Sequence, residues 1–478
     1  MIDVREKSIR ELQELMRTGA ATSKQITISY IKRIMAIDQD GPKLNAVAEL
    51  NPDAIFWAEA MDRERADGKC RGPLHGIPIL IKDNISTGDK MRTTAGSVAL
   101  ADNLAREDAP AVRALRGAGA VILGKTNLTE FANYIATTFP DGYSSRGGQV
   151  LNPYDPSFLV SGSSAGSASA AAASLCAAAL GTETAGSITC PALFNSICGL
   201  KPTVGLVSRS GIIPICGQDT AGPMGRTVED CAILLSGMIT GEDPKDPATI
   251  GLGERVKEDY AAGLGEAGPH LRVGINPVLC EVEPFPKDSM KLFEKALNTL
   301  REAGATLIET PIEYTGLAEG MLGEATMLYE FRSAMDNYLS RYATGQCRSL
   351  ADVIEFNKEH RDVALKYGQD LLELAQYGTS GRLLEADYWK MKLEAIETAQ
   401  ASIDHMLDKY SLDAIVSPGY SNLPPITGYP VISVPAGYSA SGIPVGISFY
   451  SSAYQERAIL GAAYQFEKAG KFRRGLRL

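Results

Sequence analysis

The spacing of apolar and polar residues near the start of the chain predicts two helices. Ser8 with Glu11, and Thr22 with Gln25, have the spacing of capping boxes, in which each side chain accepts a hydrogen bond from a free backbone amide of the first helical turn. Apolar residues recur at helical spacing after the second box. We therefore expect a helix to begin directly after each box.

A strand–helix–strand pattern follows these two helices. Short apolar runs at residues 77–81 and 120–123 predict buried strands, and Lys82 comes directly after the first of them. Between the strands, Asp108 is positioned to cap a helix that has Pro110 in its first turn. This order favours an α/β fold, in which helices cover both faces of a sheet.

The rest of the chain predicts further helices and then a return to strands. An alanine-rich tract at residues 168–180 is expected to form a buried helix, and residues 284–410 are mainly helical and charged. A last helix spans residues 454–469 and stops at Gly470. Short apolar runs near the end predict strands at residues 414–416, 430–435 and 444–450. Because the early and late strands are expected to share one sheet, we predict a single domain of residues 1–478.

The composition is that of a globular protein and restricts its partners. Of the 478 residues, 45% are hydrophobic and 22% are charged, and the net charge is -10. An acidic protein of this size is not expected to bind nucleic acid or an anionic membrane as its main partner. The chain has no run of about 18 apolar residues that would span a membrane, and its charged first residues do not resemble a signal peptide.

The cysteines and histidines do not indicate a metal site. Eight cysteines are scattered without a C-x-x-C pair, and the chain has only four histidines. Scattered thiols are typical of a reducing compartment, so we expect a cytoplasmic protein. No metal or organic cofactor is predicted, and the sequence leaves the oligomeric state open.

Residues 158–205 are unusually rich in serine, glycine and alanine. Small residues allow a backbone to approach a ligand or another segment closely. In the run at residues 181–188, successive backbone N–H groups could point at one oxygen atom, as acyl transfer requires for its oxyanion. By composition alone, the same run could equally be a tightly packed junction between helices.

This segment and several others, in the same order, resemble the amidase signature family. The segment reads Gly-Ser-Ser-Ala-Gly-Ser at residues 162–167 and Gly-Thr-Glu-Thr-Ala-Gly-Ser-Ile at residues 181–188, and residues 72–84 are similar to the lysine motif of that family. Further matches lie at residues 124–131, 199–205, 218–224 and 428–437. The resemblance covers roughly residues 5–240 and 410–470. It implies a single-domain fold with a large mixed β-sheet.

The resemblance also implies roles for individual residues. Ser187 matches the family's nucleophile, Ser163 its bridging serine, which is held through a cis peptide bond, and Lys82 its base. The backbone N–H groups that match its oxyanion hole belong to Thr184, Ala185, Gly186 and Ser187. The implied activity is hydrolysis of a carboxylic amide to an acid and ammonia or an amine, through a serine acyl-enzyme.

This chemistry requires an unusual state of Lys82. A serine hydroxyl needs a base within hydrogen-bond reach, and a lysine is a base only when neutral, although its reference pKa is about 10.4. Burial at the end of an apolar strand lowers the pKa of a lysine. With Ser163 relaying the proton, Lys82 does not have to contact Ser187.

An α/β-hydrolase is one alternative. Gly-Ser-Ser-Ala-Gly at residues 162–166 fits the G-x-S-x-G motif, which would make Ser164 the nucleophile and residues 158–160 the strand before it. That scheme needs a downstream histidine, and none stands in a recognisable setting. The histidines available are His270, His360 and His405.

For an amidase, the sequence leaves more than one class of substrate open. The glutamine-hydrolysing subunit of a tRNA-dependent amidotransferase would use the same Ser187, Ser163 and Lys82. Residues 145–149 and 205–214 look closer to peptide amidases, so a peptide C-terminal amide or a small-molecule amide is expected as the substrate. We expect the variable helical region, residues 284–410, to shape the substrate pocket.

Overall fold

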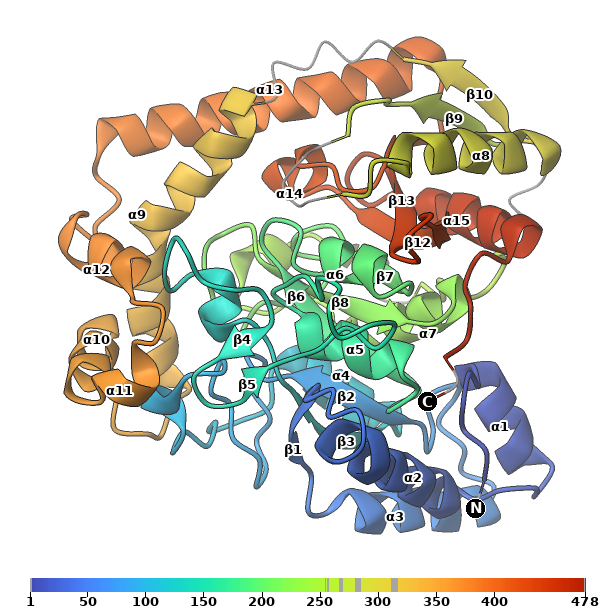
Figure 1. Cartoon of the computed structure of the whole chain (residues 1–478), viewed down its shortest axis with the longest axis horizontal. Helices are drawn as coiled ribbons and strands as arrows, with labels where there is room; N and C mark the ends of the chain where they lie inside the picture. The colour runs from blue at the N-terminus through green and yellow to red at the C-terminus, as the bar shows by residue number, and fades with distance from the viewer. Residues whose placement is uncertain are drawn as a thin grey trace.

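One large sheet forms the centre of the molecule (Figure 1). The computed structural model describes residues 2–253, 255, 258–265, 270–279, 285–310, 317–476 and 478, and for residues 317–324 it describes only the backbone. The sheet has eleven strands in the order β1-β3-β2-β6-β8-β7-β12-β13-β11-β9-β10. Their bounds are β1 Val47–Leu50, β2 Pro78–Lys82, β3 Val121–Thr126, β6 Ala178–Glu183, β7 Cys198–Lys201, β8 Thr220–Gly225, β9 Arg272–Ile275, β10 Thr306–Glu309, β11 Ala414–Pro418, β12 Val431–Tyr438 and β13 Pro444–Tyr450; β4 Tyr143–Ser144 and β5 Gly148–Gln149 form a separate pair.

The sheet is mixed. Strand β2 runs parallel to β3 and β6, whereas β12 runs antiparallel to β7 and β13.

The described α-helices are α1 Ile9–Arg17, α2 Ser23–Arg33, α3 Ala54–Ala66, α4 Pro110–Gly117, α5 Ala165–Ala172, α6 Thr189–Phe194, α7 Val228–Met238, α8 Ser289–Glu302, α9 Leu317–Arg341, α10 Leu350–Glu359, α11 Arg361–Ala364, α12 Asp370–Tyr377, α13 Ala386–Tyr410, α14 Leu423–Thr427 and α15 Glu456–Gly470.

Helices pack against the sheet and against one another. Helix α15 contacts α7 and α8, and these helices also contact strands β8, β12 and β13. Helices α5 and α6 contact each other and the strands β6, β7 and β12. The predicted α/β class with a large mixed sheet is therefore confirmed. Within the described part of the chain, no helix has both the length and the hydropathy to cross a membrane.

Strands from both ends of the chain belong to this sheet, as predicted. Leu200 of β7 pairs with Ile432 of β12, which joins the early strands to the late ones. One hydrophobic cluster extends from Ile9 of α1 through Leu80 of β2 to Phe466 of α15. This continuity supports a single domain of residues 1–478, which stays a prediction.

The two predicted capping boxes are present. Ser8 accepts a hydrogen bond from the Glu11 amide, and the Glu11 side chain accepts one from the Ser8 amide. Thr22 and Gln25 form the same reciprocal pair at the start of α2. Because both partners lie within four residues, local sequence is sufficient to determine these helix starts.

The predicted cap at Asp108 is wrong. Helix α4 begins at Pro110 after Ala109, with no side-chain cap. The Asp108 carboxylate instead accepts hydrogen bonds from the Gly88 amide at 2.7 Å and from Arg116 Nε at 3.0 Å. Proline at the first helical position has no N–H, so this helix has one fewer free donor for a cap to satisfy.

Two other boundaries differ from the prediction. The alanine-rich tract at residues 168–180 is not one helix, because α5 ends at Ala172 and strand β6 begins at Ala178, with Ser174 in the left-handed region at φ 54° between them. Gly470 is the last residue of α15, and the left-handed residue that follows is Lys471. A Cβ on Gly470 would lie 2.0 Å from the Phe472 ring, so the glycine is needed for close packing.

The described part of residues 284–410 is mainly helical, as predicted, apart from the short strand β10. Helices α9 and α13 pack against each other, and Figure 1 shows this pair reaching to one side of the sheet, with α10, α11 and α12 near its end. Strands β9 and β10 extend the sheet beyond β11 and were not predicted. Neither contains three consecutive apolar residues, so no apolar run marked them in the sequence.

Candidate active site

Lys82 lies at the C-terminal end of β2, and its side chain is fully buried. Because β2 pairs with β6, the strand that carries Thr182 runs beside it. The Lys82 ammonium nitrogen Nζ lies 2.8 Å from Ser163 Oγ, 2.9 Å from Ser164 Oγ and 2.9 Å from Thr182 Oγ1. The structure therefore brings together two of the predicted site residues, Lys82 and Ser163.

The surroundings of Lys82 favour its neutral form. Burial lowers the pKa of Lys82 to about 7, although the negative charges of Asp219 and Glu183 act in the opposite direction. Desolvation penalises a charged amine because hydroxyl partners replace the water shell only in part. Near pH 7 a large fraction of Lys82 is consequently available as a base.

Ser163 and Ser164 stand immediately before helix α5. The peptide bond between Gly162 and Ser163 is cis, as the resemblance implied. The Ser164 amide donates to the Ser187 carbonyl at 3.1 Å, which joins this segment to the turn that carries the predicted nucleophile. Ser164 Oγ donates to the Thr182 carbonyl at 3.1 Å as well as contacting Lys82.

These contacts argue against the α/β-hydrolase alternative. Residues 158–160 do not form a strand, so the strand–turn–helix setting of that motif is missing there. Ser164 is fully buried, and its hydroxyl is held between Lys82 and Thr182. His360 and His405 are exposed, and the His360 ring stacks on Phe356.

Ser187 lies in the turn between strand β6 and helix α6. One carboxylate oxygen of Glu183, Oε2, accepts hydrogen bonds from the amides of Ile188 and Thr189, both at 2.8 Å, and from Thr189 Oγ1 at 3.0 Å. The turn requires a positive φ of 84° at Gly186, and glycine adopts this conformation readily because it has no Cβ. Sequence reasoning gave Glu183 no role, although an acidic residue directly before the Ser187 turn was a signal for it.

The backbone amides of residues 184–187, the predicted oxyanion donors, lie in the turn that carries Ser187. In the described part of the chain, none of these four amides donates to another backbone or side-chain group, whereas the next two amides are held by Glu183. Thr184, Ala185 and Ser187 line one cavity. Free N–H groups at a cavity wall can stabilise a negatively charged oxygen.

This cavity has a volume of about 610 Å3, and Thr184, Ala185 and Ser187 are the predicted site residues that line it, while the rest of its wall is mostly apolar. Gly162, which precedes Ser163, lines it beside Ser187. Its larger apolar side chains come from the N-terminal half, from helices α9 and α12 and from the segment after β11; they are Tyr134, Phe139, Ile215, Met327, Leu328, Leu371, Leu374 and Tyr420. This volume is sufficient for a ligand of the size of a dipeptide.

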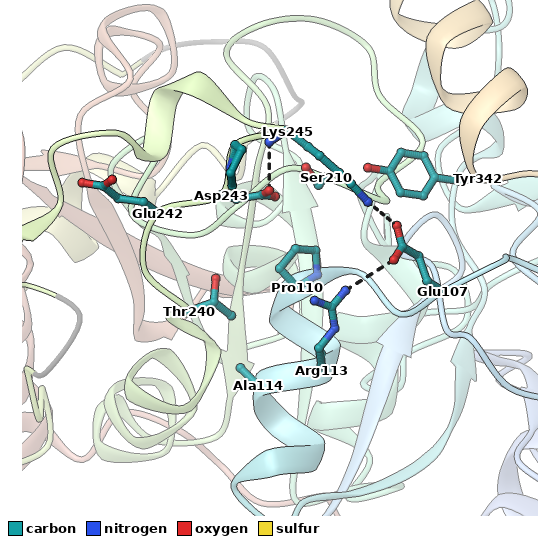
Figure 2. A pocket seen from close by; sticks show the side chains of 11 residues that line it. Glu107, Pro110, Arg113, Ala114, Ser210, Thr240, Glu242, Asp243, Lys245 and Tyr342 are labelled. Carbon is teal, nitrogen blue, oxygen red and sulfur yellow. Dashed lines mark hydrogen bonds and ion pairs between the residues drawn. The ribbon is translucent and has the colours of Figure 1, made fainter.

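A second cavity, of about 540 Å3, lies elsewhere and has charged walls (Figure 2). Lys245 Nζ contacts the Glu107 carboxylate at 2.6 Å, and Arg113 lies 3.7 Å from the same carboxylate. Lys245, Arg113 and Glu107 therefore pair with one another, and no serine here lies against a buried lysine in the described residues. Across the described residues, no cluster of three or more His, Cys, Asp and Glu side chains could hold a metal ion.

Comparisons with known proteins agree with this geometry. The family Amidase matches residues 25–426. A probable amidase of Arabidopsis thaliana is 40% identical, over 98% of this chain and 91% of the relative. The solved native peptide amidase of Stenotrophomonas maltophilia is 43% identical with a TM-score of 0.91, over 98% of both chains. A glutamyl-tRNA(Gln) amidotransferase subunit of Thioalkalivibrio sulfidiphilus is 32% identical, over 98% of both chains. The chain thus belongs to the amidase signature family and is an amidase, a hydrolase of the C–N bonds of linear amides.

Proposed function

We propose that this amidase removes the C-terminal amide group of peptides through an acyl-enzyme on Ser187. The observation that carries the mechanism is the buried contact of 2.8 Å between Lys82 Nζ and Ser163 Oγ. A lysine in this setting, with a pKa of about 7, can accept a proton at neutral pH. Ser163 is the group that would connect it to Ser187.

The proton path balances over both halves of the reaction. Ser187 Oγ attacks the amide carbonyl carbon while its proton passes to Ser163 and the Ser163 proton passes to neutral Lys82. The protons then return along the same path to the nitrogen of the substrate, the C–N bond breaks, and ammonia leaves. Water attacks the resulting ester with the same transfers, which releases the acid and restores Ser187.

The negative charge of each tetrahedral intermediate falls on the former carbonyl oxygen. The amides of residues 184–187 are the donors that we assign to this oxygen, since they have no other acceptor among the described groups. Donors fixed before the substrate binds need no reorganisation when the charge develops.

The cavity supports a peptide with an apolar residue next to the amide. Leu328, Leu371 and Leu374 from helices α9 and α12 form part of its wall, and Asn133 and Thr137 add polar groups for a peptide backbone. Likeness to the Stenotrophomonas maltophilia peptide amidase points to the same substrate class. We retain the prediction of a cytoplasmic enzyme without a cofactor.

The first test is hydrolysis by the purified chain alone. We expect ammonia release from N-acetyl-leucyl-leucinamide, with kcat/KM about tenfold or more above that for N-acetyl-leucyl-glycinamide, because burial of the leucine side chain contributes to transition-state binding. Release of ammonia is measured for both peptides and for glutamine. Hydrolysis of glutamine only, and only after addition of a partner protein, would instead favour the amidotransferase function of a relative to which the chain is also similar.

A second test concerns the turn at Gly186. A Cβ at this position would lie 2.9 Å from Cys190 Sγ and 3.1 Å from the Tyr420 ring, and φ is 84°. We expect Gly186→Ala to displace the neighbouring amides and reduce kcat by about 100-fold. Gly68→Ala is the matched control, because Gly68 has a similar φ of 73° but a Cβ there meets no atom within 4 Å. Equal kcat values for the two variants would contradict the assignment of this turn.

A further inference from the structure

We propose that Gln218 and Asp219 are positioning residues that aim the Ala185 N–H at the oxyanion. This inference rests on the proposed function and adds residues that the mechanism above does not use. Both residues belong to residues 215–219, here called the clamp loop, which leads into strand β8. Strand β8 pairs with β6, with Thr220 opposite Glu183, so the clamp loop lies beside the Ser187 turn.

The key contact holds the backbone of the turn. Gln218 Nε2 donates to the Thr184 carbonyl at 3.0 Å. That carbonyl and the Ala185 N–H belong to one planar peptide unit, and because the unit is trans they point in opposite directions. Fixing the carbonyl against Gln218 therefore turns the Ala185 N–H the other way, and Ala185 lines the substrate cavity. A hydrogen bond to the carbonyl also polarises the N–H of the same unit and strengthens it as a donor.

A second contact fixes the side chain of the same residue. Asp219 is 6% exposed, and its Oδ1 accepts a hydrogen bond from Thr184 Oγ1 at 2.6 Å. Its other oxygen accepts from the amides of Ile215 at 2.7 Å and Cys216 at 3.3 Å. The carboxylate thus ties both ends of the clamp loop to Thr184, and the loop cannot move without moving the turn.

The clamp loop is itself held by the helical pair α9 and α13. The Gly217 amide donates to the Glu330 carboxylate of α9, which also accepts from Lys392 Nζ and from Tyr388 Oη of α13. On the other side, Arg209 donates to the Gly217 carbonyl. Helix α9 also supplies part of the cavity wall. One short loop therefore connects the substrate wall to the oxyanion turn.

The charge of Asp219 gives a readout that packing alone would not. Its carboxylate is near Lys82, Arg209 and Cys216, and its charge raises the pKa of Lys82 against the effect of burial. Glu183 acts on Lys82 in the same direction. Removing the Asp219 charge should therefore lower the pKa of Lys82 and move the acid limb of the kcat/KM profile to lower pH.

The experiment compares the wild type with the variants Gln218→Ala and Asp219→Asn and with one control variant. The substrate is N-acetyl-leucyl-leucinamide. Gln13→Ala is the matched control, because Gln13 is also half-buried and donates to two carbonyls, those of Pro73 and His75, away from the cavity. We expect Gln218→Ala to reduce kcat by about 10- to 100-fold with KM changed less than about threefold. N-acetyl-leucyl-leucinal, which forms a tetrahedral oxyanion adduct, should lose affinity in parallel.

The outcomes separate this inference from the proposed function. Unchanged kcat and unchanged aldehyde affinity in Gln218→Ala, in a chain whose wild type hydrolyses the peptide amide, would overturn the inference alone. An acid limb that stays at the wild-type pH in Asp219→Asn would overturn the role of its charge. A wild type that neither hydrolyses the amide nor binds the aldehyde would overturn both proposals. Loss of kcat in Gln218→Ala, with Gln13→Ala matching wild type, would support the inference.

Discussion

Replacing Ser187 by alanine is expected to abolish amide hydrolysis, with kcat reduced by about 10^4-fold or more. The hydroxyl is the group to which the acyl chain would bond, and Ser164 cannot take its place while its Oγ is held between Lys82 and Thr182. The fold should persist, because the turn is held by Glu183 through backbone amides. Steady-state kinetics and thermal unfolding measure the two effects.

The control for this variant is Ser169→Ala. Ser169 is also buried, and its hydroxyl donates to the Leu151 carbonyl at 2.9 Å, so its loss should cost about 1 kcal/mol of stability and leave kcat unchanged. Treatment with an activated fluorophosphonate followed by peptide mapping identifies the nucleophile directly. An adduct on Ser164, or full activity in Ser187→Ala, would contradict the mechanism.

Replacing Lys82 by methionine is expected to reduce kcat by about 10^3-fold, because the general base is lost. In the wild type, kcat/KM should rise about tenfold per pH unit below pH 7 and level off above it, since Lys82 with a pKa of about 7 must lose its proton to act. Lys201→Met is the matched control: Lys201 is equally buried and has its pKa lowered to about 8, but its Nζ donates to the Pro202 carbonyl. This control should keep the wild-type midpoint near pH 7. A wild-type profile that is flat across this range would contradict a titrating lysine as the base.

The same lysine makes the folded state sensitive to pH. Unfolding returns the pKa of Lys82 from about 7 to its ordinary value of 10.5, so the unfolded chain binds more protons between these two pH values. The free energy of unfolding of the wild type should therefore rise, relative to Lys82→Met, by about 5 kcal/mol from pH 7 to pH 10.5. Below pH 7 the difference should stay constant, because Lys82 is then protonated in both states. Urea unfolding across this range measures the change, and a difference independent of pH would contradict the burial of a neutral lysine.

Elements with a local cause could be predicted from the sequence. The capping boxes at Ser8 and Thr22 join residues three apart, and the buried strands at residues 77–81 and 444–450 are marked by their own apolar residues. The cap at Asp108 was predicted from the same kind of local pattern, and this prediction was wrong because the Asp108 carboxylate accepts hydrogen bonds from Gly88 and Arg116 instead. Strands β9 and β10 were missed because neither contains a run of three apolar residues.

For the site, the sequence by itself determined which residue types are present and in what order. The motifs around Lys82, Ser163 and Ser187 indicated the family, and the apolar run before Lys82 indicated a buried lysine. The tertiary structure alone decided how these groups meet. Lys82 and Ser163 are 81 positions apart, and Gln218 and Thr184 are 34 apart, so only the tertiary structure brings each pair into contact; the pairing of β6 with β8 places the clamp loop beside Thr184. The apolar run indicated the direction of the Lys82 pKa shift, but its size was decided by the tertiary structure, because desolvation depends on every segment packed around the amine.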